Sequence, residues 1–155
     1  MQRAYEARRV PEDAPSFFAN ILYLEHAGEK ILFDSGNGAI GGGALVSQLR
    51  ANGIQPDDIT VIILTHGHSD HIRGLIVSED SDELVFANAR YYISQTEWDY
   101  WLQPEVPTFT STLPQEALAQ TAALAKLIFG RVRCACSAQG HGAVAEVTLG
   151  WRAAQ

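Results

Sequence analysis

A continuous apolar run from Val61 to Leu64 is the clearest feature in the pattern of hydrophobic and polar positions along the chain. The run is short, rich in β-branched residues and followed by a polar segment, which predicts a strand covered on both faces. Upstream, Asn20–His26 and Lys30–Phe33 have the composition of strands, and the connector Ala27–Glu29 between them predicts a hairpin. Because His26 ends the first of these strands, we interpret it as a surface residue of the hairpin.

Between the hairpin and the apolar run, Ala44–Asn52 has the pattern of a helix, and Gly53 stands where glycine caps a helix C-terminus. The preceding stretch Asn37–Gly43 is predicted to be a flexible loop. An anion-cradling role for it is weakly supported, because the G-x-G-x-x-G spacing is absent. Further strands are predicted at Leu84–Phe86 and Tyr91–Ile93. This order predicts a mixed sheet with helices packed on it, an α/β (α+β) fold.

A short aromatic helix is predicted after the last strand. Ser94 begins it, and Glu97 follows three residues later as in a capping box. The aromatic side chains of this helix are interpreted either as core or as the lining of a substrate pocket. They are Trp98, Tyr100 and Trp101.

A second helix is predicted at Pro114–Phe129, after a loop that contains two prolines. Thr112 and Gln115 have the spacing of a capping box at its start, and Gly130 is predicted to end it. Apolar residues at helical spacing predict its buried stripe. These residues are Leu118, Ala122, Ala125 and Phe129.

The composition indicates a single globular domain, since 46% of the 155 residues are hydrophobic and 19% are charged. The formal net charge of −7 disfavours nucleic acid and anionic membrane as partners, because both require a basic surface. One group of acidic residues contributes to this charge. It is interpreted as a solvated loop, with metal collection as the alternative. The group comprises Glu79, Asp80, Asp82 and Glu83.

No apolar stretch nears the roughly 20 residues that span a bilayer. The start of the chain, Met1–Arg9, also lacks the apolar segment of a signal peptide, so a cytoplasmic location is expected. In a reducing compartment, Cys134 and Cys136 are expected to be free thiols, since one intervening residue gives poor disulfide geometry. A metal role for this pair beside His141 is the alternative, although no second cysteine pair completes a tetrahedral site.

The most informative chemistry lies directly after the apolar strand, where four potential metal ligands stand within one short segment. They are His66, His68, Asp70 and His71. The strand fixes the start of this loop, so the loop can direct several imidazoles and a carboxylate at one place. Imidazole nitrogen and carboxylate oxygen are ligands that zinc and related ions favour. The alternative is a polar loop that happens to be rich in histidine.

This segment resembles the H-x-H-x-D-H signature of the metallo-β-lactamase fold superfamily, whose intact fold is an αββα sandwich. Ile31–Gly36 is similar to that family's strand ending in Asp-Thr-Gly. Ile72–Leu75 resembles the family's short segment after the final histidine of this signature. Phe86–Ala89 and Ser94–Trp101 resemble the branch that contains methyl parathion hydrolase and related lactonases. The resemblance extends from Phe17 to Arg133.

The resemblance implies a small-molecule substrate and a cofactor of one or two ions, zinc or another divalent metal. It also implies that His66 and His68 bind the first ion and that Asp70 and His71 bind the second. A bound Zn²⁺ lowers the pKa of water to about 7, so the implied nucleophile is metal-bound hydroxide, which Asp70 would orient. Asp34 is interpreted either as a partner that holds a ligand histidine in one tautomer or as a simple turn residue.

The later metal ligands of the family, a third histidine, a bridging aspartate and a last histidine, have no match here. His141 is the only downstream histidine and a possible extra ligand, but it lacks the Thr-Pro-Gly-His context. Residues 131–155 form a tail without family resemblance, and a frame shift or gene fragment near Arg133 is one explanation. We therefore expect a single partial domain over residues 1–155, corresponding to the N-terminal half of the sandwich.

The sequence supports three functional hypotheses. The first is a metal-dependent hydrolase that acts on a lactone, another ester or a phosphotriester. The second is a truncated, inactive relative that still binds metal, and the third is a non-catalytic oligomeric module. Because half of a sandwich exposes apolar sheet surface, and such patches favour association, a homo-oligomer is expected.

Overall fold

The computed structural model describes residues 19–103 and 114–138, and for residues 134–138 it describes the backbone alone. None of the helices in these ranges combines the length and the apolar character needed to cross a bilayer. The sequence predictions on the loop with two prolines, on Thr112, on His141, on most of the tail and on the side chains of Cys134 and Cys136 lie outside the described residues.

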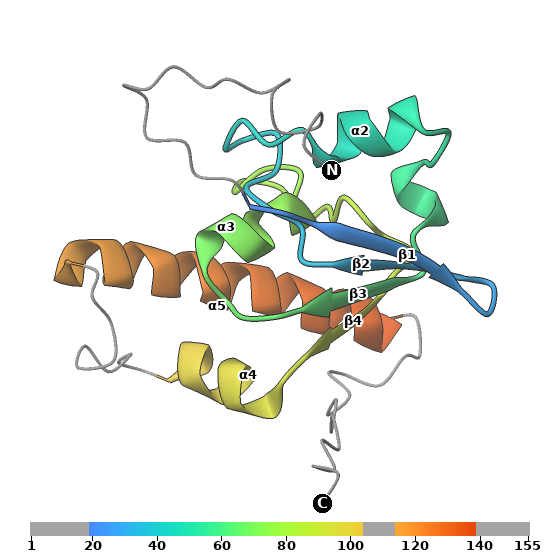
Figure 1. Ribbon diagram of the computed structural model, residues 1–155. Coiled ribbons are helices and arrows are strands. Elements are labelled where there is room, and N and C mark those ends of the chain that lie inside the picture. The colour runs from blue at the N-terminus through green and yellow to red at the C-terminus, as the bar shows by residue number, and fades with distance from the viewer. Residues whose placement is uncertain (1–18, 104–113, 139–155) are drawn as a thin grey trace, which may run out of the picture.

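Four strands form one mixed sheet in the order β1-β2-β3-β4 (Figure 1). They are β1 (Leu22–His26), β2 (Glu29–Phe33), β3 (Val61–Leu64) and β4 (Arg90–Ile93). β1 pairs with β2 in antiparallel orientation, whereas β2 with β3 and β3 with β4 are parallel. Parallel neighbours end at the same edge of a sheet, so the carboxyl ends of β2, β3 and β4 lie together.

The predicted hairpin is confirmed, with a tighter turn than expected. Only Ala27 and Gly28 connect the two strands, and Glu29 already belongs to β2. Both turn residues have positive φ, 51° at Ala27 and 84° at Gly28, as a two-residue turn of type I′ requires. The turn sets the register in which Leu24 pairs with Ile31.

The predicted strand at Leu84–Phe86 is wrong. Leu84 makes only an isolated bridge with Ile76, after which the chain turns. Phe86 is fully buried in this turn, and its carbonyl oxygen accepts a hydrogen bond from the Tyr91 hydroxyl at 2.7 Å. The segment therefore contributes to the core from a turn, because strand propensity reflects fit to a half-buried surface more than a backbone preference.

The helices pack against one face of the sheet. They are α2 (Leu45–Ala51), α3 (Ser69–Ile72), α4 (Gln95–Leu102) and α5 (Gln115–Ala138), with 3-10 turns at Pro56–Asp58 and Arg73–Leu75. In Figure 1, α5 runs behind the sheet, and it contacts α3, α4 and β4. Five strand side chains on this face are buried: Leu32, Ile62, Leu64, Tyr91 and Ile93. Tyr23 of β1, which pairs with Leu32, is partly buried on the same face. This layer of helices on a mixed sheet confirms the predicted fold class.

The longest helix, α5, has the predicted buried stripe but not the predicted end. All four residues of the stripe are buried. The predicted stop at Gly130 is wrong, since the helix continues to Ala138. Glycine in a helix interior costs only about 1 kcal/mol relative to alanine, and burial of Val132 beyond it offsets this cost.

The predicted C-terminal cap of α2 is confirmed. Gly53 has a φ of 77°, and its amide donates to the carbonyl oxygen of Arg50 at 3.0 Å. The Ile54 amide donates to the carbonyl oxygen of Leu49, also at 3.0 Å. This pair of bonds is the Schellman arrangement, in which a left-handed residue closes the helix. Leu49 is buried in the core, so the cap and the packing of α2 stabilise each other.

The glycine-rich loop Asn37–Gly43 uses its own carbonyl groups to satisfy its amides. The Gly43 amide donates to the carbonyl oxygen of Gly38 at 2.6 Å. The Gly41 amide donates to that of Asn37 at 3.2 Å. Since these donors are engaged within the loop, they are not free to bind an anion, which argues against the anion-cradling alternative.

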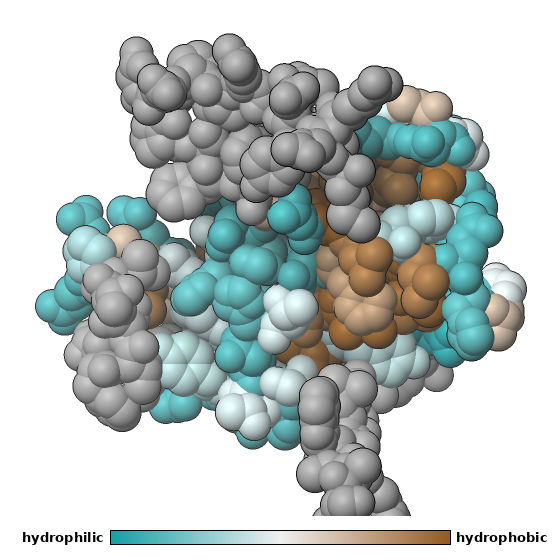
Figure 2. Space-filling model, viewed as in Figure 1, coloured by the Kyte–Doolittle hydropathy of each residue, from teal (hydrophilic) through white to brown (hydrophobic). Residues whose placement is uncertain are grey.

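The face of the sheet opposite the helices is more open. Leu22 and Leu24 lie on this side of β1 and are 58% and 44% exposed. Their cross-strand partners, Phe33 and Ile31, are only partly buried. Figure 2 shows an apolar area over the strands in the same view as Figure 1. Apolar strand residues are therefore left accessible on this side of the layer.

Arg131 of α5 binds the acidic loop around Glu79, which follows the 3-10 turn Arg73–Leu75. The guanidinium donates to the carbonyl oxygens of Ser78 and Glu79 at 2.9 and 2.6 Å. It also lies 3.4 Å from the carboxylate of Asp82, whose side chain is fully exposed. The backbone of the loop is thus held by a nearly buried cation, and the exposure of Asp82 agrees with a solvated loop at that residue.

Replacing Gly130 with alanine should stabilise the protein, because the position is helical and a Cβ built there has no heavy atom within 4 Å beyond its chain neighbours and the backbone of its own helix. We expect the free energy of unfolding, measured by urea denaturation, to rise by about 0.5–1 kcal/mol. The matched control is Gly28→Ala, which also has open space but a φ of 84°, and which should destabilise the protein. Equal effects of the two substitutions would contradict a helical Gly130.

Candidate metal centre

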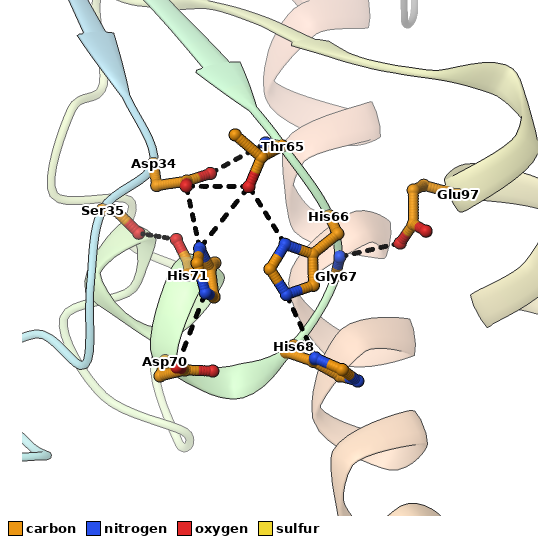
Figure 3. A network of polar contacts seen from close by, with 9 residues as sticks. All are labelled: Asp34, Ser35, Thr65, His66, Gly67, His68, Asp70, His71 and Glu97. Carbon is orange, nitrogen blue, oxygen red and sulfur yellow. Dashed lines mark hydrogen bonds and ion pairs between the residues drawn. The ribbon is translucent and has the colours of Figure 1, made fainter. Parts of the chain in front are cut away.

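The H-x-H-x-D-H segment spans the loop after β3 and the start of α3. β3 ends at Leu64, and His68 caps the N-terminus of α3. The amides of His71 and Ile72 donate to the His68 carbonyl oxygen at 2.9 and 3.2 Å. The first two histidines therefore lie before the helix, whereas Asp70 and His71 lie on its first turn. All four side chains gather at the carboxyl end of β3 (Figure 3).

Asp34 directly follows β2, the strand beside β3. It holds the loop of residues 65–71, which we call the metal loop because it contains the proposed ligands. The residue is 6% exposed. Its Oδ1 accepts from the Thr65 amide at 2.8 Å, and its Oδ2 accepts from the Thr65 hydroxyl at 2.8 Å. Oδ2 also lies 2.8 Å from Nδ1 of His71. The adjacent Ser35 fixes the backbone of His71, because its amide and its hydroxyl both donate to the His71 carbonyl oxygen at 2.8 Å.

These contacts determine which ring nitrogens carry protons. Because a carboxylate only accepts, Nδ1 of His71 is the donor, and Nε2 of the neutral ring has a free lone pair. The Thr65 hydroxyl gives its one proton to Asp34, so it accepts from Nδ1 of His66, which is 3.0 Å away. Nε2 of a neutral His66 is then unprotonated as well. Asp34 thus orients one histidine directly and a second through Thr65, as partners behind metal ligands do.

His66 is held in its neutral form. Burial lowers the pKa of its imidazole below the ordinary value. The neighbouring His71 and His68 lower that pKa further, against the opposing effects of Glu97 and Asp34. A neutral imidazole at neutral pH keeps the lone pair that a metal ion requires.

The donor atoms fit divalent metal ions in type and spacing. Nε2 of His66 lies 3.0 Å from Nδ1 of His68, and Nε2 of His71 lies 3.5 Å from a carboxylate oxygen of Asp70. Two ligands that are each about 2.0–2.1 Å from one tetrahedral zinc ion stand roughly 3.3–3.4 Å apart. Both separations lie within about 0.4 Å of this value. Within the described residues, no group of three or more metal-binding side chains converges, so each ion would have two donors from this part of the chain.

Glu97 is a residue of the site that the sequence analysis missed. Half of the predicted capping box forms, since the Ser94 hydroxyl caps α4 by accepting from the Glu97 amide at 3.2 Å. The Glu97 carboxylate contacts the metal loop: its Oε2 accepts from the Gly67 amide at 2.9 Å and from Nε1 of Trp101 at 2.8 Å. In the sequence, the capping box predicts a local partner for this carboxylate, the backbone amide of Ser94. No sequence pattern predicts a hydrogen bond from Glu97 to another element.

The two tryptophans of α4 are buried, which favours the core interpretation. Trp98 stacks on Phe129 of α5, with ring centroids 5.1 Å apart. Trp101 also borders the metal loop, since its ring centroid lies 5.4 Å from that of His68. Tyr100 is partly buried against the same core. A pocket-lining role for these rings stays a prediction.

Comparison with known proteins supports the fold that carries this loop. The family model described as the metallo-beta-lactamase superfamily matches residues 14–79. Metallo-beta-lactamase domain-containing protein 1 of Mus musculus is 49% identical over 55 residues, which are 36% of this chain and 21% of the mouse protein. Exodeoxyribonuclease WalJ of Streptococcus pneumoniae is 39% identical over 56 residues, which are 36% of this chain and 20% of that protein.

Among solved structures, the chain is similar to AidC, a dizinc quorum-quenching lactonase in complex with a product, with a TM-score of 0.65 and 31% identity. The match covers 74% of this chain and 40% of the AidC chain. The chain thus spans less than half of that structure and about a fifth of the two curated relatives. The described residues have the fold of the metallo-beta-lactamase superfamily.

Proposed function

We propose that this chain is the metal-binding part of a hydrolase that uses zinc or another divalent ion to cleave a lactone, another ester or a phosphotriester. The observation that carries the proposal is the paired geometry of the donors. Two histidine nitrogens lie 3.0 Å apart, and beside them a histidine nitrogen and a carboxylate oxygen lie 3.5 Å apart. The proton positions that Asp34 imposes leave the metal-facing nitrogens of two of these rings unprotonated.

In this proposal, His66 and His68 hold a first ion, and Asp70 and His71 hold a second. Divalent ions supply Lewis-acid chemistry at such a centre, since they acidify water and polarise a carbonyl or phosphoryl oxygen. The Asp70 side chain is half exposed, so it can orient the attacking water as well as bind an ion. Asp34 is buried and acts on the site by holding His71.

A lactone or other ester is supported by the similarity to AidC, whose title describes a lactonase. A phosphotriester fits the same chemistry, because it also presents an electrophilic centre with a polarisable oxygen. Both are small molecules that require no basic binding surface, which agrees with the formal net charge of −7.

A nuclease is the second candidate, and one observation favours it: a relative is named an exodeoxyribonuclease. Hydrolysis of a phosphodiester would use the same ions. The net charge of −7 favours the small-molecule substrate, because proteins that bind nucleic acid neutralise its phosphates with basic side chains. A truncated relative that binds metal without turnover is the remaining alternative, since the described residues offer each ion two donors.

The chain should bind zinc through the metal loop, and His68→Ala should weaken the binding more than about tenfold because it removes a direct donor. Zinc per chain is measured by elemental analysis after dialysis against trace zinc. Hydrolysis of a lactone, an aryl ester, a phosphotriester and single-stranded DNA is measured on the same samples. The matched control is His26→Ala, since His26 is exposed at the end of β1 and should bind no metal.

Ester, lactone or phosphotriester hydrolysis that is lost in His68→Ala but kept in His26→Ala supports the leading proposal. DNA cleavage with the same dependence favours the nuclease. Bound zinc without any turnover identifies an inactive relative. Wild-type protein that holds no more zinc than His68→Ala contradicts the metal centre itself.

We also propose that the chain forms a homo-oligomer through the open face of the sheet. Leu22 and Leu24 are more than two fifths exposed on β1, where burial of apolar surface by a second copy would be favourable. The apolar area over the strands in Figure 2 supports the same surface.

A chain with both Leu22→Glu and Leu24→Glu should sediment as a monomer at concentrations at which the wild type is oligomeric, because paired carboxylates make burial of this face costly. The matched control is Leu127→Glu, which places a carboxylate on an exposed leucine of α5 and should leave the oligomer intact. A monomeric wild type in sedimentation at high concentration would refute this proposal.

A further inference from the structure

Helix α4 contacts the metal loop at the residue between its first two histidines. Glu97 Oε2 accepts from the Gly67 amide at 2.9 Å and from Nε1 of Trp101 at 2.8 Å. In Figure 3 the Glu97 side chain reaches Gly67 from outside the loop. Hydrogen bonds to a carboxylate are charge-assisted and about twice as strong as neutral ones.

The second contact is steric. A Cβ built on Gly67 would collide with Cδ1 and Nε1 of the Trp101 indole, so the Gly67 backbone lies directly against the ring. Trp101 is 2% exposed and is therefore a rigid wall rather than a mobile side chain. The same ring meets the His68 imidazole edge to face, with an interplanar angle of 72°.

A glycine at this position makes an external constraint necessary. Glycine has more backbone freedom than any other residue, so rotation about Gly67 would move His66 and His68 relative to each other. The Gly67 amide belongs to the planar peptide group that it shares with His66. A hydrogen bond that fixes the direction of the Gly67 N–H therefore also fixes the orientation of the peptide plane between His66 and Gly67.

We propose that Glu97 and Trp101 form a clamp on Gly67 that sets the separation of His66 and His68, the proposed ligands of the first ion. Both are positioning residues, because they act on the donors through the loop backbone. The clamp acts from α4, on the side of the loop opposite Asp34, which holds Thr65 and His71 from β2. The consequence for metal binding rests on the proposed function, whereas the clamp itself does not.

The first test measures hydrogen exchange of the Gly67 amide by NMR in the metal-free chain. Glu97→Ala should speed this exchange about tenfold, the factor that corresponds to loss of one charge-assisted hydrogen bond. Trp101→Phe keeps a ring against Gly67 but removes the indole N–H, and should have a smaller effect. The matched control is Asp99→Asn, which removes a carboxylate of the same helix whose hydrogen bond within the described residues is to the nearby Gln95 side chain, at 2.7 Å.

The second test measures Co²⁺ binding by its visible absorption. Glu97→Ala should bind the first Co²⁺ about 10–100-fold more weakly, as expected for a residue behind metal ligands. Its absorption bands should also shift, because the two donors no longer have a fixed separation. Asp99→Asn should match the wild type in both readouts. Circular dichroism and thermal unfolding of the metal-free variants show whether each is folded. If Glu97→Ala is not folded, Glu97→Gln, which keeps the side-chain volume, takes its place.

The outcomes separate the clamp from the proposed function. Faster Gly67 exchange with weaker Co²⁺ binding in a folded Glu97 variant supports the clamp. Unchanged exchange, or unchanged Co²⁺ affinity and spectrum in a wild type that does bind the ion, overturns it. If the wild type binds no Co²⁺, the proposed function fails. The clamp is then decided by Gly67 exchange and by the ring-proton shifts of His66 and His68, which must move in the Glu97 variant and not in Asp99→Asn.

Discussion

The buried carboxylate of Asp34 is the interaction on which the geometry of the site depends. The parallel pairing of β2 with β3 brings this group to the start of the metal loop, where it bonds both the amide and the hydroxyl of Thr65 and the ring of His71. Asp34 has a φ of 65°, a conformation that costs energy for any residue other than glycine. The hydrogen bonds of Asp34 to Thr65 and His71 stabilise this conformation, which directs the carboxylate at the loop.

Two carboxylates from different elements hold the metal loop, and they act on different parts of it. Asp34 from β2 orients side chains, directly at His71 and through the Thr65 hydroxyl at His66. Glu97 from α4 holds the backbone at Gly67. Such support favours ligand binding by a loop that presents several imidazoles at one place, because rings that are already fixed lose less conformational entropy when a ligand binds. The loop is therefore pre-organised by the sheet on one side and by a helix on the other.

The described residues that build this loop also leave two features open. They form one layer of helices on one mixed sheet, and they bring together two pairs of donor atoms beyond β3. The open face with Leu22 and Leu24 is the face on which a second layer would pack. Within the described residues, an open sheet face and donor atoms that gather only in pairs thus occur together.

The sequence by itself determined the elements whose causes are local. Continuous apolar character predicted β3, glycine after a helical stretch predicted the cap at Gly53, and ligand spacing predicted which residues meet beyond β3. Only the tertiary structure decided that α5 continues through Gly130, that Phe86 packs from a turn, and that Glu97 bonds Gly67. In each case a non-local contact outweighed a local preference of about 1 kcal/mol or less. Propensities and caps are readable along the chain, whereas the partners of a buried carboxylate depend on which elements pack side by side.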